Sequence, residues 1–451
     1  MTALLQDLAA FVADVRFDQL DGATIEHVKL HAFDSLGLAL AGTHTDEALA
    51  TLRVFASTYS NQEAPLAAAL RSAGVLPMAA SWCVAARLTE CDDIHLPSST
   101  TPGSVVFPVA LILGSASSCS GRRLIEAAVA GYEVMTAIGE FAGGANAVYR
   151  GTWPTYLGAA LTAAATAARV WDLAEESVEH ALAIAATVTR GLAGNIAEDP
   201  SSRWLTLGCA VQNGILAARA AALGVKGDRT LLAQTNRVLG IEADSAAPVG
   251  LSKNPRLNDV SLKPYQTSRQ GLGATEAFAG LLRDGSLDVR TVDRIEVIVP
   301  EPYRQMIDRS RRPTSKTESR GIPYQLGLTA LHPDELFDLN RTNLRSSELD
   351  MCRLMDRVTV QSSESFTRMY PLRWPGAVRV TSGGQVLERT EITPKGDPQN
   401  PLGWAGVESK LGKIATCLGQ DLPISELSAA VGRLETLDSL YPITDALLAS
   451  F

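Results

Sequence analysis

The sequence is poor in cysteine and histidine, with six of each among 451 residues. The cysteines form no CxxC pair, so neither a zinc site nor a disulfide framework is indicated, and a reducing cytoplasm fits best. The histidines form neither HxH nor HExxH, so nothing predicts a metal site. A GxSxG segment and a Walker motif are also missing, which removes support for serine-based hydrolysis and for a phosphate-binding loop.

Long apolar runs are missing as well. The most apolar segment, residues 156–168, is shorter than the roughly 18 residues that a membrane span needs. Asp7 and Asp14 interrupt the first segment, where a secretory signal requires an apolar stretch. The net charge of −9 opposes nonspecific attraction to nucleic acid or anionic lipid. We therefore expect a cytoplasmic protein that binds neither nucleic acid nor membrane.

The chain contains two kinds of pattern, and its length suggests two domains. Ala- and Leu-rich runs of helical length fill residues 1–266, whereas β-branched, alternating runs centred near Ile295, Val358 and Val380 are typical of strands. Gly383 and Gly384 suit a hairpin turn. Helical patterns return after residue 395. The sequence predicts a mainly α fold: a large all-helical domain (1–266 with 396–451) and a smaller α/β domain (267–395).

The densest polar cluster runs from Glu90 to His95 and precedes a loop and an apolar helix. Adjacent carboxylates such as Asp92 and Asp93 raise one another's pKa, and His95 can exchange a proton near neutrality, as general acid–base chemistry requires. The alternative is a solvated loop whose Ser104 caps the next helix. Spacing alone favours this alternative.

A second cluster lies at the predicted domain boundary, where clefts often form. Lys263, Tyr265 and Arg269 could hold a carboxylate through charge-assisted hydrogen bonds. A solvated linker is the competing interpretation. Two further residues, Arg203 and Tyr324, are weak candidates, because a surface charge and a packed phenol are the commoner roles for these residue types.

Several segments together resemble the MmgE/PrpD family over nearly the full length. They are residues 34–42, Asp92-Asp93-Ile94-His95 with Pro102-Gly103-Ser104, Gly131-Tyr132-Glu133-Val134, Asn213-Gly214, Lys263-Pro264-Tyr265, Tyr324 and residues 396–402. The resemblance implies a homodimer with the active site in the cleft between its two domains, and neither metal nor cofactor. It also implies di- or tricarboxylate substrates and dehydration, decarboxylation or epimerisation next to a carboxylate.

The chain departs from the family pattern at four positions. Thr101 and Trp153 stand where the family commonly has histidine, Arg203 stands at a lysine position and Thr206 replaces another histidine. Arginine keeps the charge but does not readily exchange a proton. We therefore expect a pocket that still binds an anion but transfers protons differently.

The resulting hypothesis is a cofactor-independent lyase, a dehydratase or decarboxylase. Asp93 and His95 perform acid–base chemistry, while Lys263 and Tyr324 complete the catalytic set, the first by holding a carboxylate and the second by a supporting proton or hydrogen-bond role. The predicted substrate-binding residues are Asp92, Thr101, Trp153, Arg203, Tyr265 and Arg269. Two alternatives remain, an epimerase or isomerase of a carboxylated substrate and a noncatalytic binding protein on the same fold.

Overall fold

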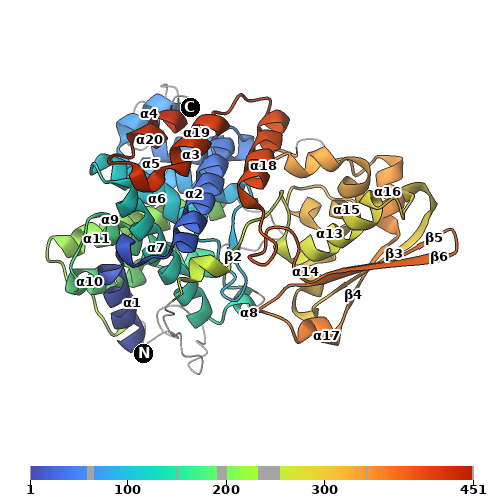
Figure 1. Cartoon of the computed structure of the whole chain (residues 1–451), viewed down its shortest axis with the longest axis horizontal. Helices are drawn as coiled ribbons and strands as arrows, with labels where there is room; N and C mark the ends of the chain where they lie inside the picture. Colours follow the sequence, from blue (N-terminus) through green and yellow to red (C-terminus); the bar gives the residue numbers. More distant parts are fainter. Residues whose placement is uncertain are drawn as a thin grey trace.

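A computed structural model describes residues 2–57, 66–148, 151–189, 201–231, 254–341 and 344–448. Its N-terminal part is a bundle of helices (Figure 1). These helices are α1 (Thr2–Asp14), α2 (Gly22–Thr43), α3 (Asp46–Ser57), α4 (Leu66–Ala73), α5 (Val75–Leu88), α6 (Gly103–Ala116), α7 (Gly121–Phe141), α8 (Ala145–Val148), α9 (Pro154–Val170), α10 (Glu175–Val188) and α11 (Ser202–Ala222).

The centre of this bundle is α9, every residue of which is buried, as its apolar sequence predicts. Small residues let its neighbours approach closely. A side chain at Gly131 of α7 would meet Thr166 Oγ1 at 2.4 Å, and one at Gly214 of α11 would meet the Ala160 carbonyl oxygen at 2.2 Å. The alanine-rich composition therefore produces a tightly packed core whose helices cannot easily shift.

The smaller part contains a four-stranded sheet in the order β4-β3-β5-β6. β3 (Val292–Val299) runs parallel to β4 (Val358–Ser362) and antiparallel to β5 (Gly376–Ser382), and β5 forms a hairpin with β6 (Gln385–Glu391). The hairpin turn is the predicted one, with φ of 55° at Gly383 and 81° at Gly384. Its helices are α13 (Arg269–Arg283), α14 (Arg304–Ile307), α15 (Ile322–Leu331), α16 (Leu349–Asp356) and α17 (Glu364–Thr367).

Three C-terminal helices return to the bundle: α18 (Gly403–Leu418), α19 (Ile424–Gly432) and α20 (Tyr441–Leu448). α18 and α19 pack against α2, where Trp404 stacks on Phe33 with ring centroids 5.0 Å apart. Both ends of the described chain lie on the helical part (Figure 1). The predicted mainly α fold with a smaller α/β domain is confirmed, while the domain limits 1–266 with 396–451 and 267–395 stay a prediction.

Short elements connect the longer helices and strands. The 3-10 helices are η1 (Phe17–Gln19), η4 (Arg256–Asp259), η5 (Val289–Thr291), η6 (Glu301–Tyr303), η7 (Glu318–Arg320), η8 (Pro333–Phe337) and η9 (Leu434–Thr436). β1 (Ile94–His95) pairs antiparallel with β2 (Val260–Ser261). This pairing brings the polar segment that begins at Glu90 beside the segment that contains Lys263.

The segment after β6, through which the chain returns to the helical part, lies beside the segment that follows β2. The Leu262 amide donates to the Gly396 carbonyl at 2.9 Å. Gly396 has a φ of 100°, and a side chain there would meet the Leu262 carbonyl oxygen at 1.8 Å, so only glycine fits. Among the described helices, none is long and apolar enough to cross a membrane.

Candidate active site

A cavity of about 80 Å³ lies between the helical part and the smaller domain. Because one water needs roughly 10–15 Å³ of such space, the cavity is large enough for a small organic molecule. Among the described residues that line this cavity, one is acidic, Glu90, and several are basic. The basic lining residues are Arg87, Arg203, Lys263, Arg269, Arg309 and Arg320.

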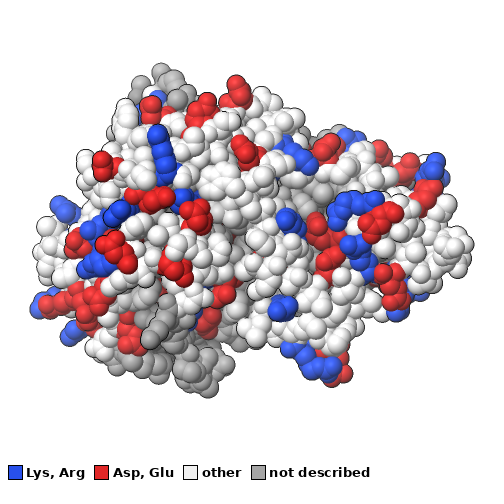
Figure 2. All heavy atoms as spheres, viewed as in Figure 1, with Lys and Arg blue, Asp and Glu red and all other residues white. Residues whose placement is uncertain are grey.

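This concentration of positive charge is local. The chain as a whole is acidic, and on the face shown in Figure 2 basic and acidic side chains are interspersed. Inside a cleft with low-dielectric walls, a few converging cations dominate the potential. The cavity is therefore suited to an anion even though the protein carries a net negative charge.

Glu90 is the centre of an ion-pair network at the cavity wall. Its carboxylate lies 3.1 Å from Arg87 Nη1 and 3.4 Å from Arg320 Nη1, so it joins α5 to η7 of the smaller domain. Burial alone would raise the pKa of Glu90, but the charges of Arg87 and Arg320 outweigh it and hold this pKa well below its usual value. Glu90 is therefore a fixed negative charge.

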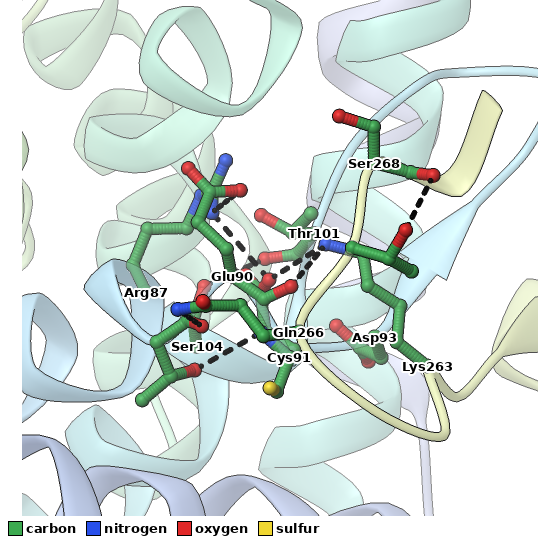
Figure 3. Close-up of polar contacts among 12 residues, drawn as sticks. Arg87, Glu90, Cys91, Asp93, Thr101, Ser104, Lys263, Gln266 and Ser268 are labelled. Atoms are coloured by element: carbon green, nitrogen blue, oxygen red, sulfur yellow. Dashed lines mark hydrogen bonds and ion pairs between the residues drawn. The ribbon is translucent and has the colours of Figure 1, made fainter. Parts of the chain in front are cut away.

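Lys263, in the segment that follows β2, contacts the same network. Its Nζ donates to the Glu90 carbonyl at 3.0 Å and lies 3.3 Å from Asp92 Oδ1, and Figure 3 shows Arg87, Glu90 and Lys263 pointing toward one another. Asp92 is completely buried, and its Oδ2 has no hydrogen-bond partner within the described part of the chain. Burial raises the pKa of Asp92, opposed by the charges of Arg87 and Lys263.

Helix N-termini add to the positive character of the cavity. Thr155 and Tyr156 belong to the first turn of α9, Arg203 to that of α11, and Arg269 and Gln270 to that of α13; all five line the cavity. Each helix has the positive end of its dipole at this terminus. Three helices from two parts of the molecule thus favour an anion at one place.

Asp93 lies behind this wall and is not a lining residue. Its Oδ2 accepts from the Tyr132 hydroxyl at 2.5 Å and lies 3.3 Å from His31 Nδ1, while Oδ1 accepts from the Gly103 amide at 3.0 Å. The side chain is buried, with 2% of its surface exposed. These hydrogen bonds fix the start of α6 next to α7, and the acid–base role of Asp93 stays a prediction.

Four other predicted residues also lie outside the lining, namely Asp92, which contacts Lys263 from behind, His95, Tyr265 and Tyr324. His95 faces a second cavity with Arg256, and its Nδ1 is 2.8 Å from Ser98 Oγ. Burial, helped by the charge of Arg256, lowers the pKa of His95 to about 3, so the imidazole is neutral. The Tyr265 hydroxyl donates to Glu276 at 3.0 Å.

Tyr324 packs with Tyr265 in one apolar cluster of the smaller domain, and its hydroxyl accepts from the Arg345 amide at 3.3 Å. Thr206 also lies away from the cavity, and its hydroxyl donates to the Ser202 carbonyl at 3.1 Å. The roles predicted for His95, Tyr265 and Tyr324 stay predictions, because none of the three side chains lines the cavity.

The remaining predicted residues line the cavity in different ways. Arg269 donates from Nη2 to both carboxylate oxygens of Asp397 at 2.6 and 2.7 Å, so its charge is compensated. The guanidinium of Arg203 lies 4.2 Å from the centre of the Trp204 ring. Thr101 donates its amide to Thr155 Oγ1 at 3.0 Å. Trp153 immediately precedes α9 and is partly buried.

Sequence reasoning missed Arg87, Arg309 and Arg320 and gave no role to Glu90. Arg87 ends a helix and Arg320 lies in a charged loop, both of which are common surroundings for solvated arginine. Neither residue is near Lys263 in the chain. Only the three-dimensional arrangement shows that these side chains share one cavity wall.

Two family models match the chain: the MmgE/PrpD N-terminal domain over residues 6–244 and the MmgE/PrpD C-terminal domain over residues 265–427. The chain belongs to the MmgE/PrpD family, as the resemblance of its segments predicts. Cis-aconitate decarboxylase of Homo sapiens is similar to it, with 26% identity over 238 residues. That match covers 51% of this chain and 49% of the human protein, so it spans about half of each.

The described residues contain no group of three or more His, Cys, Asp or Glu side chains that could hold a metal ion. The side chains at the cavity that can take part in chemistry are its cations, the Glu90 carboxylate and its hydroxyl groups, and Asp92 lies behind them in contact with Lys263. This set can bind a carboxylate, stabilise negative charge that develops next to it and exchange protons through Lys263.

Proposed function

We propose that this protein is a lyase, a dehydratase or decarboxylase, that acts on a di- or tricarboxylate by proton transfer next to a carboxylate. The supporting observation is the wall formed by Arg87, Lys263 and Arg320 between the two parts of the molecule. Family membership and the similarity to cis-aconitate decarboxylase favour the same reaction class. We also expect a homodimer in the cytoplasm, as the resemblance and the cysteine usage suggest.

In this proposal the arginines bind and polarise the substrate. A guanidinium can bind a carboxylate through two parallel N–H donors, and it stays charged throughout the reaction. Arg87 and Arg320 are already held in place by Glu90, so little reorganisation is needed when the substrate enters. The first turns of α9, α11 and α13 stabilise the negative charge that develops on the substrate.

Lys263 is the proton-transfer group of the proposal, because the arginines of the wall do not exchange protons. In a dehydration, the Lys263 amine takes the proton from the carbon next to the carboxylate, and the resulting ammonium gives that proton to the hydroxyl of the neighbouring carbon, which leaves as water as the double bond forms. In a decarboxylation, carbon dioxide leaves, its bonding electrons remain on carbon, and the Lys263 ammonium protonates that carbon. Asp92 orients the lysine through their 3.3 Å contact.

The experiment is proton NMR on a panel of di- and tricarboxylic acids in deuterated buffer. A lyase converts one acid to an alkene or to a product with one carboxylate fewer, and Lys263→Met should abolish the conversion, whereas Lys395→Met at an exposed position should not. Deuterium uptake without elimination would replace the lyase by an epimerase. Binding of an acid without any chemical change would replace it by a noncatalytic binding protein.

A further inference from the structure

The cavity has an apolar side as well as a cationic one. Four of its lining residues are Ile94 of β1, Val148 of α8, Trp153 before α9 and Met306 of α14. Trp153 and Met306 are only partly buried, so each leaves apolar surface uncovered. A ligand composed of carboxylates alone would have no apolar group to pack against this surface.

The apolar side is built by both parts of the molecule. Trp153 packs against the core of the helical part, whereas Met306 and Ile94 belong to the core of the smaller domain. A ligand group that filled this side would contact both parts at once. The uncovered area would then be removed from water, which is favourable in proportion to its apolar surface.

The polar groups beside Trp153 are occupied. Thr155, two residues after Trp153, accepts at its Oγ1 from the Thr101 amide at 3.0 Å and lies 3.2 Å from Thr101 Oγ1, so these two lining residues bond to each other. The basic residues of the Glu90 network come instead from α5, η7 and the Lys263 segment. The lining therefore offers apolar surface in addition to the groups that bind charge.

We propose that the substrate is a carboxylate that carries an apolar substituent, an alkyl or aryl group, which packs on Trp153, Val148 and Met306. This inference rests on the proposed function and deepens it, because it names the substrate class of the same site. Trp153 is then a specificity-determining residue that selects for the substituent.

The test is calorimetric titration of the full-length protein with succinate, n-propylsuccinate and phenylsuccinate. Each buried methylene is worth roughly fourfold in affinity, so n-propylsuccinate should bind on the order of 10- to 50-fold more tightly than succinate. Trp153→Ala should reduce this ratio to a few-fold. Trp171→Ala, at the opposite end of α9 and outside the lining, should leave the ratio unchanged.

Trp153→His serves as a second variant if the alanine variant does not fold, and it should lower the same ratio. Equal or weaker binding of n-propylsuccinate by the wild-type protein would overturn the inference while leaving the proposed binding of dicarboxylates intact. A ratio that survives in both folded Trp153 variants would also overturn it. Failure of all three acids to bind would overturn the proposed function together with the inference.

Discussion

A buried ion pair supports the loop that carries Glu90 and Asp92, and its removal gives a quantitative test of that support. Lys410 of α18 lies 2.8 Å from Asp34 of α2, and both side chains are 1% exposed. The Lys410 ammonium also donates to the Cys91 carbonyl at 2.7 Å. Cys91 stands between Glu90 and Asp92, so α18 holds this loop in place.

Lys410→Met removes one partner and leaves the other charge buried. Breaking a buried pair in this way lowers the free energy of unfolding by about 3–5 kcal/mol. In the double variant Lys410→Met with Asp34→Leu no charge remains buried, and the expected loss is about 1–3 kcal/mol, the penalty for a Cys91 carbonyl without its donor. Lys413→Met on the same helix, where the exposed ammonium lies 4.7 Å from the Phe337 ring centre, should lose only about 0.5–1 kcal/mol.

The effect should also depend on pH. Burial raises the pKa of Asp34, and Lys410 opposes this rise. Between the unfolded and folded pKa values the folded state binds more protons, so stability falls as pH rises through that window. Without Lys410 the window extends upward, and the variant should lose more stability at pH 8 than at pH 5.

Urea denaturation of the wild type, the two single variants and the double variant at both pH values measures these differences. A loss below about 1 kcal/mol in Lys410→Met that is independent of pH would refute the reasoning, because it would show that the buried Asp34 carboxylate tolerates the absence of its partner. Equal losses of unfolding free energy in Lys410→Met and in the double variant would show that the uncompensated Asp34 charge is not the cause of the destabilisation.

Three further predictions concern the site and its surroundings. Arg320→Met should weaken binding of a dicarboxylate by roughly 10- to 100-fold, measured by calorimetry, because one charge-assisted hydrogen bond is worth about 1.5–3 kcal/mol; unchanged affinity would remove Arg320 from the site. Asp93→Asn keeps the shape of the side chain but not its charge, so turnover should fall, and undiminished turnover would end its assignment as acid–base residue. Burial lowers the pKa of His95 to about 3, whereas an unfolded histidine titrates at about 6.5. The unfolded state therefore binds more protons between these two pH values, and stability falls as pH drops through this window. In His95→Asn the urea midpoint should fall less between pH 7 and pH 5 than in the wild type, and an equal fall in both proteins would contradict the lowered pKa of His95.

The features of the fold that follow from local pattern were predictable. The run that becomes α9 is apolar on all sides and is buried throughout, and the glycines at 383 and 384 form the expected turn between β5 and β6. In each case the information lies within about 20 neighbouring residues, where periodicity and turn chemistry act directly.

The composition of the cavity was predictable only in part. Lys263 and Asp92 attracted notice because each stands in a dense polar cluster, and the structure brings them to 3.3 Å. Arg87 and Arg320 carry no comparable signal, because a lone arginine in a helix or loop has the same local pattern whether it faces solvent or a cavity. Their roles depend on the pairing of β1 with β2 and on the position of η7, which are long-range properties of the fold.

The position of Asp93 shows why a dense polar cluster does not by itself identify the reacting group. Its carboxylate accepts from the Tyr132 hydroxyl and the Gly103 amide, so its lone pairs are largely used in fixing α6 against α7. A carboxylate held in this way positions its neighbours, whereas a group that transfers a proton to a substrate must reach the cavity. Lys263 lines the cavity, whereas Asp93 is not among its lining residues, so the acid–base role of Asp93 stays a prediction. The same short segment thus contains a residue that supports the wall, Asp93, and one that orients the lysine in it, Asp92.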